Sequence, residues 1–393
     1  MNYAELFKNH KVVKDLSLLQ LLVYFATWFS NVAIYTMLVE FGSSELAIAT
    51  VTAMHFLPAI FIAVLSGAII DRFNIKKLMY ILMFVELSMT LLFLTIDKPS
   101  EIWLLMLFIF IRMSASSMFF STEMSLLSKL LSGQALQRAN EIHSIIWSLT
   151  YALGMAISAL VVNAYGVTTA FIIDACMFVF ALLLLMRIHF EVQANEYNHK
   201  IKKLIVDGFN YIKNHKLIFR LIILHASVGL TSFDTLVTLL AKNEYKHVIA
   251  VPLAIGLSNA TRAVGLMIGP FILSKFTNKD SLYYLLILQG ITIIFWGLVQ
   301  ENFYLALFAQ FTIGLFTTTL WSFTYALLQE NCEKEYIGRV VSYNDMFFMI
   351  SCAGTTFLIG ILANYVSLAT ITIILGIGFI LFATYYKGLL KWI

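Results

Sequence analysis

Five ionisable side chains lie within long apolar stretches of this 393-residue sequence: Glu86, Arg112, Glu123, Asp234 and Arg262. A charged group in the hydrocarbon of a membrane is costly, so residues of this kind usually mark the path of a substrate, an ion or a proton. A carboxylate in an apolar cavity also binds a proton more readily than a carboxylate in water. The five residues are therefore the first candidates for substrate binding or proton transfer.

The spacing of these residues limits how they can pair. Arg112 and Glu123 are eleven positions apart, which is three helical turns. They share one face of a helix but are separated by about 16 Å along its axis, too far for an ion pair. Arg262 needs an acidic partner, which either Asp234 or Asp345 can supply.

Besides these five, three further ionisable residues occur in apolar surroundings: Asp174, His55 and His225. Asp174 is expected to cap or pair helices rather than to carry a proton. Glu86 lies in the middle of an apolar stretch, and Arg112 or a neighbouring group can pair with it. His55 and His225 are single histidines on apolar faces, and we expect hydrogen-bonded core residues rather than proton carriers there.

The composition indicates what kind of protein positions these side chains. The chain is 60% hydrophobic and 12% charged, whereas a soluble domain carries about 25% charged residues. The apolar runs are long and rich in aromatic residues, which favours a helical membrane bundle over a membrane barrel. The three cysteines form no metal-binding pattern, so no metal or cofactor is expected. No GxSxG, HExxH or P-loop motif occurs, which argues against an enzyme and against an ATP-driven pump.

The elements are predicted from the length of the apolar runs, since a membrane helix needs about 20 such residues. Twelve spans are expected, at residues 17–40, 46–70, 76–96, 101–131, 141–164, 167–188, 217–241, 248–274, 281–299, 302–329, 340–365 and 368–387. A hydrophilic linker at 189–216 separates two six-helix bundles, 1–188 and 217–393. Apolar residues from Ile201 to Ile212 recur near helical spacing, which predicts an amphipathic helix at the membrane surface. The expected fold is thus an all-α membrane protein with twelve transmembrane helices.

The distribution of Lys and Arg predicts the orientation. Of the 26 such residues, the loops on one side hold only Lys98, Lys242 and Lys246, while Arg112 and Arg262 lie inside spans. The other side contains both termini and the linker. Because cytoplasmic loops carry the excess of positive charge, we expect both termini in the cytoplasm and a multi-pass protein of the inner membrane.

A short charged turn, SGAIIDRFNIKK at residues 66–77, joins the second and third spans. It resembles the signature of the major facilitator superfamily, with matches at Gly67, Asp71, Arg72 and Lys76. Asn74 stands where the family usually has Gly, and we expect it to take the left-handed turn conformation. The resemblance implies a cytoplasmic gate that breaks when the inner side opens, and a topology anchor without a gating role is the alternative.

Four other stretches resemble the macrolide-efflux and enterobactin-exporter branch of that superfamily. They are LQRANEI (136–142), AFIIDACMF (170–178), DGFNYIKNHKLIFRLIIL (207–224) and GRVVS (338–342). In the family, the first, fourth, seventh and tenth spans line a cavity, and Arg112 matches an Arg tied to proton coupling. The resemblance places Arg112, Glu123 and Asp234 at this cavity. Aromatic side chains can form its wall: Tyr24, Trp28, Tyr35, Phe119, Trp321 and Tyr325.

These observations together indicate a monomeric secondary transporter, a proton-coupled exporter of amphipathic drug-like or siderophore-like compounds. Its partners are the substrate, protons and the lipid bilayer, with no nucleic acid. Exporters often carry Gly-Pro in the fifth span, whereas this chain has Gly154-Met155. Uptake by proton symport therefore stays open, as does a lipid or lysolipid flippase. A membrane scaffold or sensor that transports nothing is the alternative from another class.

Overall fold

The computed structural model describes residues 3–190 and 201–392, and these parts of the chain contain helices and no strand. The first group of helices is α1 (Tyr3–Asn9), α2 (Lys11–Glu40), α3 (Glu45–Ala53), α4 (Leu57–Arg72), α5 (Ile75–Phe93), α6 (Ile102–Leu130) and α7 (Gly133–Arg187). The second is α8 (Ile201–Asn214), α9 (Lys216–Ala226), α10 (Asp234–Asn243), α11 (Val251–Leu273), α12 (Ser281–Val299), α13 (Phe303–Glu330), α14 (Ile337–Leu362) and α15 (Leu368–Leu389). Short 3₁₀ turns occur at Pro99–Glu101, Ser227–Thr231, Tyr245–His247 and Ser274–Phe276.

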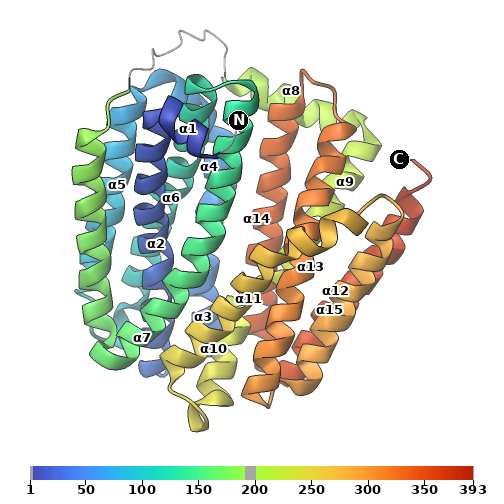
Figure 1. The fold of residues 1–393 in the computed structure, drawn as a ribbon. Coiled ribbons are helices and arrows are strands. Elements are labelled where there is room, and N and C mark those ends of the chain that lie inside the picture. Colours follow the sequence, from blue (N-terminus) through green and yellow to red (C-terminus); the bar gives the residue numbers. More distant parts are fainter. Residues whose placement is uncertain (1–2, 191–200, 393) are drawn as a thin grey trace.

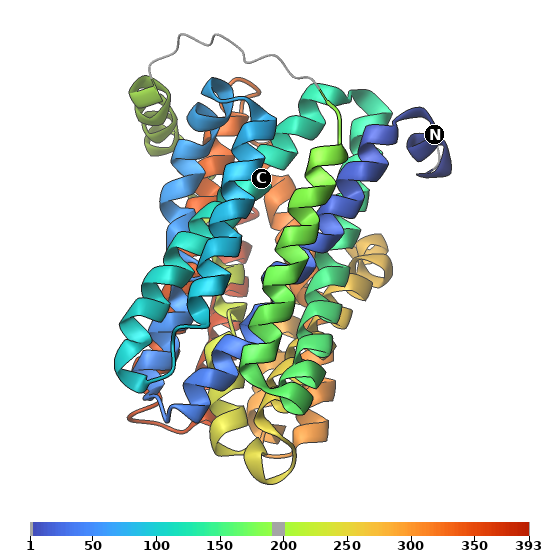
Figure 2. The same cartoon turned by 90° about the vertical axis from the view of Figure 1, so that its left-hand side faces the viewer.

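The described helices account for the twelve expected spans. Ten helical segments are long and apolar enough to cross a membrane, and the 55-residue α7 is one of them. A helix of that length is about 80 Å long, more than twice the thickness of a bilayer core. It bends back at Gly166, where φ is 82°, so its two arms run in opposite directions and form two spans (Figures 1 and 2). The 19-residue α5 supplies the twelfth span and carries Lys76, Lys77 and Glu86.

Two of the spans are broken, which the sequence analysis did not anticipate. In the second span the helix stops after Ala53 and resumes at Leu57, next to Pro58 in the first turn of α4. In the seventh span a 3₁₀ turn at Ser227–Thr231 separates α9 from α10, so that Asp234 occupies the first turn of a new helix. These breaks free backbone groups and redirect side chains in the middle of the bundle.

The helices form two groups that lie side by side in Figure 1, α2–α7 in blue to green and α9–α15 in yellow-green to red. We call them the N-half and the C-half. Both marked chain ends lie at the same end of the bundle as α1 and α8 (Figure 1). We call this the linker end, and the other the opposite end. The precise domain boundaries remain a prediction. The expectation that the linker end faces the cytoplasm also remains a prediction.

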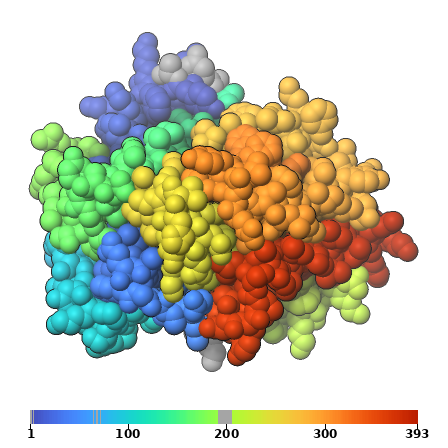
Figure 3. All heavy atoms as spheres, turned by 90° about the horizontal axis from the view of Figure 1, so that it is seen from below, coloured from blue at the N-terminus to red at the C-terminus, as the bar shows by residue number. Residues whose placement is uncertain are grey.

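The two halves pack closely towards the opposite end. A Cβ atom on Gly256 of α11 would overlap the Cβ of Ala159 and lie 2.7 Å from the carbonyl oxygen of Met155, both in α7. A Cβ on Gly360 of α14 would likewise overlap the Cβ of Ala49 in α3. Small residues let membrane helices approach this closely. Figure 3 shows the halves meeting across this face, with the yellow segment between green and orange.

The predicted amphipathic helix is α8, which packs against the C-half. The Tyr343 hydroxyl of α14 donates a hydrogen bond to the carbonyl oxygen of Ile205 at 2.9 Å. The ring of Tyr211 stacks on Tyr336 with 4.2 Å between centroids, and the Tyr211 hydroxyl accepts a hydrogen bond from the Glu333 amide. The linker residues 191–200 lie outside the described residues.

Candidate functional site

Arg112 is buried within the N-half. Its guanidinium forms an ion pair with Asp174 of α7 at 2.9 Å and donates a hydrogen bond to the Ser30 hydroxyl of α2. The rings of Phe93 and Phe178 lie 5.6 and 5.5 Å from its central carbon, within cation–π range. The expected helix-pairing role of Asp174 agrees with this contact, and Arg112 joins α2, α6 and α7 through it.

Glu86 lies near this pair, buried on α5. Its carboxylate accepts a hydrogen bond from Thr27 of α2 at 3.4 Å, and its other oxygen has no partner among the described residues. Thr90, one turn further along α5, donates to Asp174 at 3.4 Å. This part of the N-half thus encloses the carboxylates of Glu86 and Asp174 and the guanidinium of Arg112, with Glu86 outside the ion pair.

Glu123 is fully buried on α6, closer to the linker end than Arg112. The Tyr24 hydroxyl of α2 donates to it at 2.6 Å, while its other carboxylate oxygen accepts no hydrogen bond from a described residue. Beside it, the Gln20 amide and His143 Nδ1 are 3.1 Å apart, and the Phe120 ring lies 5.1 Å from His143. No basic side chain of the described residues forms an ion pair with Glu123.

Arg262 of α11 lies where the two halves meet. One guanidinium nitrogen donates to the Tyr151 hydroxyl of α7 at 2.5 Å and to the Asn259 amide oxygen at 3.2 Å. The other donates to the backbone of Thr231 at 2.9 Å. Asp234 is 3.9 Å away, so it is the acidic partner that the sequence left open between two residues. This network links the break in the seventh span to the N-half.

A second polar contact joins the halves at the opposite end. Lys242 of α10 donates to the carbonyl oxygen of Ser43 at 2.7 Å and lies 3.6 Å from the carboxylate of Glu45, at the start of α3. Together with the Arg262 network and the glycine contacts, it closes the opposite end of the bundle in this conformation.

The charged turn between α4 and α5 has a geometry that differs from the expected one. Asn74 has φ −62° and ψ 118°, so its expected left-handed conformation is wrong. It is instead the N-cap of α5, and its side chain accepts a hydrogen bond from the Lys77 amide at 3.0 Å, satisfying a free helix-end donor. Lys76 donates to the carbonyl oxygen of Ile188 at the end of α7 at 2.6 Å. Arg72 is exposed, whereas the surroundings of Gly67 and of the Asp71 side chain lie outside what the structure describes.

The aromatic candidates fall into separate groups. Tyr24, Tyr35 and Phe119 are buried in the N-half. The Trp28 ring lies 4.6 Å from Tyr151, beside the Arg262 network. Trp321 and Tyr325 stack on each other in the C-half with 5.0 Å between centroids. The structure therefore does not bring all six side chains into one wall.

The comparison of sequences decides the family. The sequence profile of the Major Facilitator Superfamily matches residues 16–356. The chain belongs to the major facilitator superfamily. Members of this superfamily are transporters and not enzymes, which confirms the expectation drawn from the missing catalytic motifs.

Relatives of this superfamily member are distant in sequence. It is 24% identical over 382 residues to the uncharacterised MFS-type transporter YkuC of Bacillus subtilis, covering 91% of this chain and 86% of YkuC. It is 21% identical to the Staphyloferrin A transporter of Staphylococcus aureus, over 82% of each chain. It is 22% identical to Macrolide efflux protein A of Streptococcus pyogenes, over 79% of each chain. The resemblance to the macrolide-efflux branch is confirmed at this low identity.

Solved structures show the same superfamily fold. The nucleoside transporter NupG superimposes with a TM-score of 0.73 over 97% of this chain and 99% of its own, at 15% identity. The all-helical membrane fold expected from the sequence is thereby confirmed.

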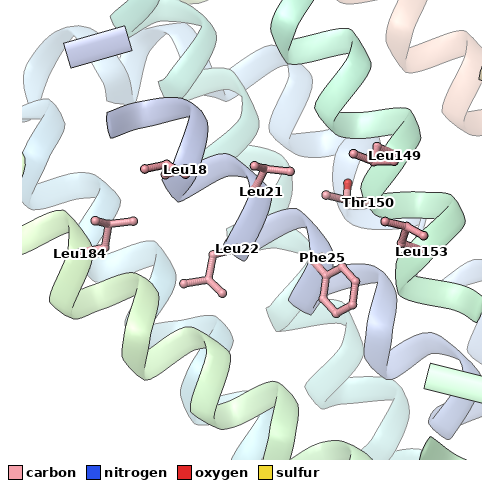
Figure 4. A pocket seen from close by; sticks show the side chains of 8 residues that line it. All are labelled: Leu18, Leu21, Leu22, Phe25, Leu149, Thr150, Leu153 and Leu184. Carbon is pink, nitrogen blue, oxygen red and sulfur yellow. The ribbon is translucent and has the colours of Figure 1, made fainter. Parts of the chain in front are cut away.

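A hollow in the surface of this superfamily member is lined mainly by leucine side chains (Figure 4). It has a volume of about 430 Å³ and lies between α2 and the two arms of α7. Its lining is Leu18, Leu21, Leu22, Phe25, Leu149, Thr150, Leu153 and Leu184. Leu18 and Leu153 are among the exposed residues, as expected for a side facing lipid rather than a polar substrate.

Sequence reasoning missed several polar residues that complete the site. Tyr151, Asn259, Gln20 and His143 all contact a candidate residue or its neighbour. Each is a polar side chain inside an apolar run, which was the available signal. Asn259 lies one helical turn from Arg262, but the contacts of Tyr151 with Arg262 and of Gln20 with His143 join residues more than 100 positions apart, which helical periodicity could not identify.

Proposed function

We propose that this chain is a secondary active transporter that exports amphipathic organic compounds in exchange for protons. It works in the inner membrane with the linker end towards the cytoplasm, as a monomer that rocks its two halves about a central substrate site. The names of the two relatives with known cargo, a macrolide efflux protein and a siderophore transporter, support this substrate class. The excess of Lys and Arg at the linker end supports the orientation.

The observation that carries the proposal is the environment of Glu123. This carboxylate is fully buried, accepts a hydrogen bond from the Tyr24 hydroxyl and lacks a basic partner among the described residues. An unpaired charge in such a place is unfavourable, so the group exchanges a proton when its access to water changes. Asp234 differs, because Arg262 lies 3.9 Å away. We therefore assign the proton to Glu123 and an interface role to Asp234.

The remaining candidates have supporting roles in this proposal. Arg112 holds α6 against α7 through Asp174 and so fixes the helix that carries Glu123. Glu86 is a second buried carboxylate in the same half. The turn with Gly67, Asp71, Arg72 and Lys76 is assigned to the gate at the linker end.

The experiment measures proton movement in proteoliposomes that contain the purified protein and a pH-sensitive dye. Macrolides, cationic dyes and siderophore-like compounds are added in turn. We expect the wild type to move protons with at least one of them, and Glu123→Gln to abolish the signal while Asp234→Asn weakens it. Glu330→Gln, an exposed acid at the end of α13, is the matched control and should behave as wild type.

The sign of the proton signal separates two functions. Protons that move against the substrate indicate export by antiport, and protons that move with it indicate uptake by symport. The absence of Pro after Gly154 keeps symport as the second candidate. If folded wild type moves no protons with any compound, the proton-coupled proposal fails for these substrates.

A further inference from the structure

An aromatic cluster surrounds His225 in the part of the C-half that is nearer the linker end. The centroid of the His225 ring lies 5.5 Å from Trp321, 5.3 Å from Tyr325 and 5.5 Å from Phe348. Trp321 and Tyr325 stack with an angle of 23° between their planes. The cluster therefore joins three helices, α9, α13 and α14, around one buried imidazole.

The helix geometry explains why these side chains converge. Trp321 and Tyr325 are four residues apart on α13, and Asp345 and Phe348 are three apart on α14, so each pair shares a helix face. Helix α9 packs against both α13 and α14 and carries His225 between them. Asp345 thus shares a face of α14 with Phe348, whose ring lies beside His225.

Two polar groups of the cluster lack a hydrogen-bond or ionic partner among the described residues. Nδ1 of the fully buried His225 is 2.9 Å from the Thr324 hydroxyl, whereas Nε2 has no hydrogen-bond partner. Asp345 is half-buried, and its described polar contact is with the Asn344 amide at 3.5 Å, without a basic partner. Trp321 is 38% exposed although it lies inside the span. The cluster therefore places stacked aromatic rings beside a carboxylate that has no basic partner among the described residues, and both kinds of group attract an organic cation.

We propose that Trp321, Tyr325, Phe348, His225 and Asp345 form a subsite for an organic cation that carries aromatic or other flat apolar groups. The ring faces attract the cation by cation–π interaction, and Asp345 neutralises its charge. The inference rests on the proposed function, because it names the substrate class of that transporter. It goes further by placing the positively charged end of the substrate in the C-half, away from Glu123 on α6.

The test uses two probes of nearly the same size and shape with opposite charge, tetraphenylphosphonium and tetraphenylborate. Binding of each to purified protein in detergent is measured by isothermal titration calorimetry, without a membrane or a proton gradient. We expect the wild type to bind the phosphonium and not the borate. Asp345→Asn and Trp321→Ala should each weaken phosphonium binding on the order of tenfold, the scale of one cation–π or ionic contact.

Two matched variants control for the loss of an acid or an indole elsewhere. Glu330→Gln removes an exposed acid on α13, and Trp103→Phe changes an indole that is 63% exposed on α6. Both should bind the phosphonium as the wild type does. Trp321→Phe should retain more affinity than Trp321→Ala, because a phenyl ring still offers a π face.

The comparison of probes needs no variant, so a misfolded mutant cannot hide the answer. Equal binding of borate and phosphonium, or no phosphonium binding by the wild type, would overturn the inference. Unchanged affinity in Asp345→Asn that elutes as a single folded species would also overturn it. If the wild type binds the phosphonium but moves no protons with any compound in the liposome assay, the proposed function fails and the subsite stands. If it moves protons with a macrolide but does not bind the phosphonium, the subsite fails and the proposed function stands.

Discussion

The guanidinium of Arg112 illustrates how this bundle tolerates charge in an apolar interior. Asp174 neutralises it, Ser30 accepts a hydrogen bond from it, and the Phe93 and Phe178 rings face it. Breaking such a pair leaves one charge buried and alone, which costs more than the pair itself contributes. The pair therefore acts as a fixed joint between α6 and α7.

At this scale we predict that Arg112→Met, which strands the Asp174 charge, lowers the free energy of unfolding by about 3 to 5 kcal/mol. Adding Asp174→Asn removes the stranded charge, so the double variant should lose less than the two single variants together. Unfolding by SDS titration measures all three. Arg138→Gln at the half-buried Arg138–Glu141 pair near the surface is the control and should change the midpoint far less. If the losses of unfolding free energy in the two single variants simply add up in the double variant, Arg112 and Asp174 do not stabilise each other.

Some of this residue chemistry could be predicted from the sequence. The separation of Arg112 from Glu123 follows from helix geometry alone. The pairing of Arg112 with Asp174, 62 positions away, does not, because it depends on which helices pack together. The choice of Asp234 over Asp345 for Arg262 depends on the break in the seventh span, which turns Asp234 towards α11.

Among the elements, the backbone at Gly166 has a special role. With φ 82° and ψ 171°, it occupies a region that other residues essentially do not adopt, and it reverses the chain between the two arms of α7. The sequence predicted two spans with a short gap there, because the gap falls between two apolar runs. The breaks after Ala53 and Ala226 were not predicted, since both lie within continuous apolar runs.

We predict that Gly166→Ala destabilises the protein by about 1 to 3 kcal/mol through backbone strain. Gly354→Ala is the matched control, because Gly354 is helical and a Cβ atom there meets no described atom within 4 Å. It should be neutral or stabilise by roughly 0.5 to 1 kcal/mol. Thermal unfolding in detergent, followed by circular dichroism, compares the two variants. Equal stabilities would show that the turn relaxes without strain.

For the whole molecule, closure at the opposite end defines the conformation seen here. Lys242 reaches Ser43 and Glu45, Arg262 reaches Tyr151, and glycines bring α11 against α7. The sequence predicted the two bundles but could not predict this arrangement. A transporter that alternates has more than one packing of the same halves, and the hydrophobic pattern of each helix is compatible with all of them.

Holding the opposite end shut should stop transport without stopping ligand binding. In a background without native cysteines, Glu45→Cys and Lys242→Cys are joined by a short bismaleimide that contains a cleavable disulfide. We expect transport in proteoliposomes to fall to the background level, because the halves must separate at this end. Transport should return when the disulfide of the chemical cross-linker is reduced. The single Glu45→Cys variant with the same reagent is the control. Full transport by the cross-linked protein would refute the assigned gate.

The attachment of α8 to the C-half has a consequence for observing this motion. Since Tyr343 and Tyr211 hold α8 to α14 and its preceding loop, we expect α8 to move together with that half in the proposed transport cycle. A spin label on α8 would therefore keep a narrow distance distribution to a label on α14. The distance from α8 to a label at the start of α5 would instead split into two populations as the halves rock. Distances measured from a spin label on this surface helix therefore report the occupancy of each state, and no probe is needed in the transport path.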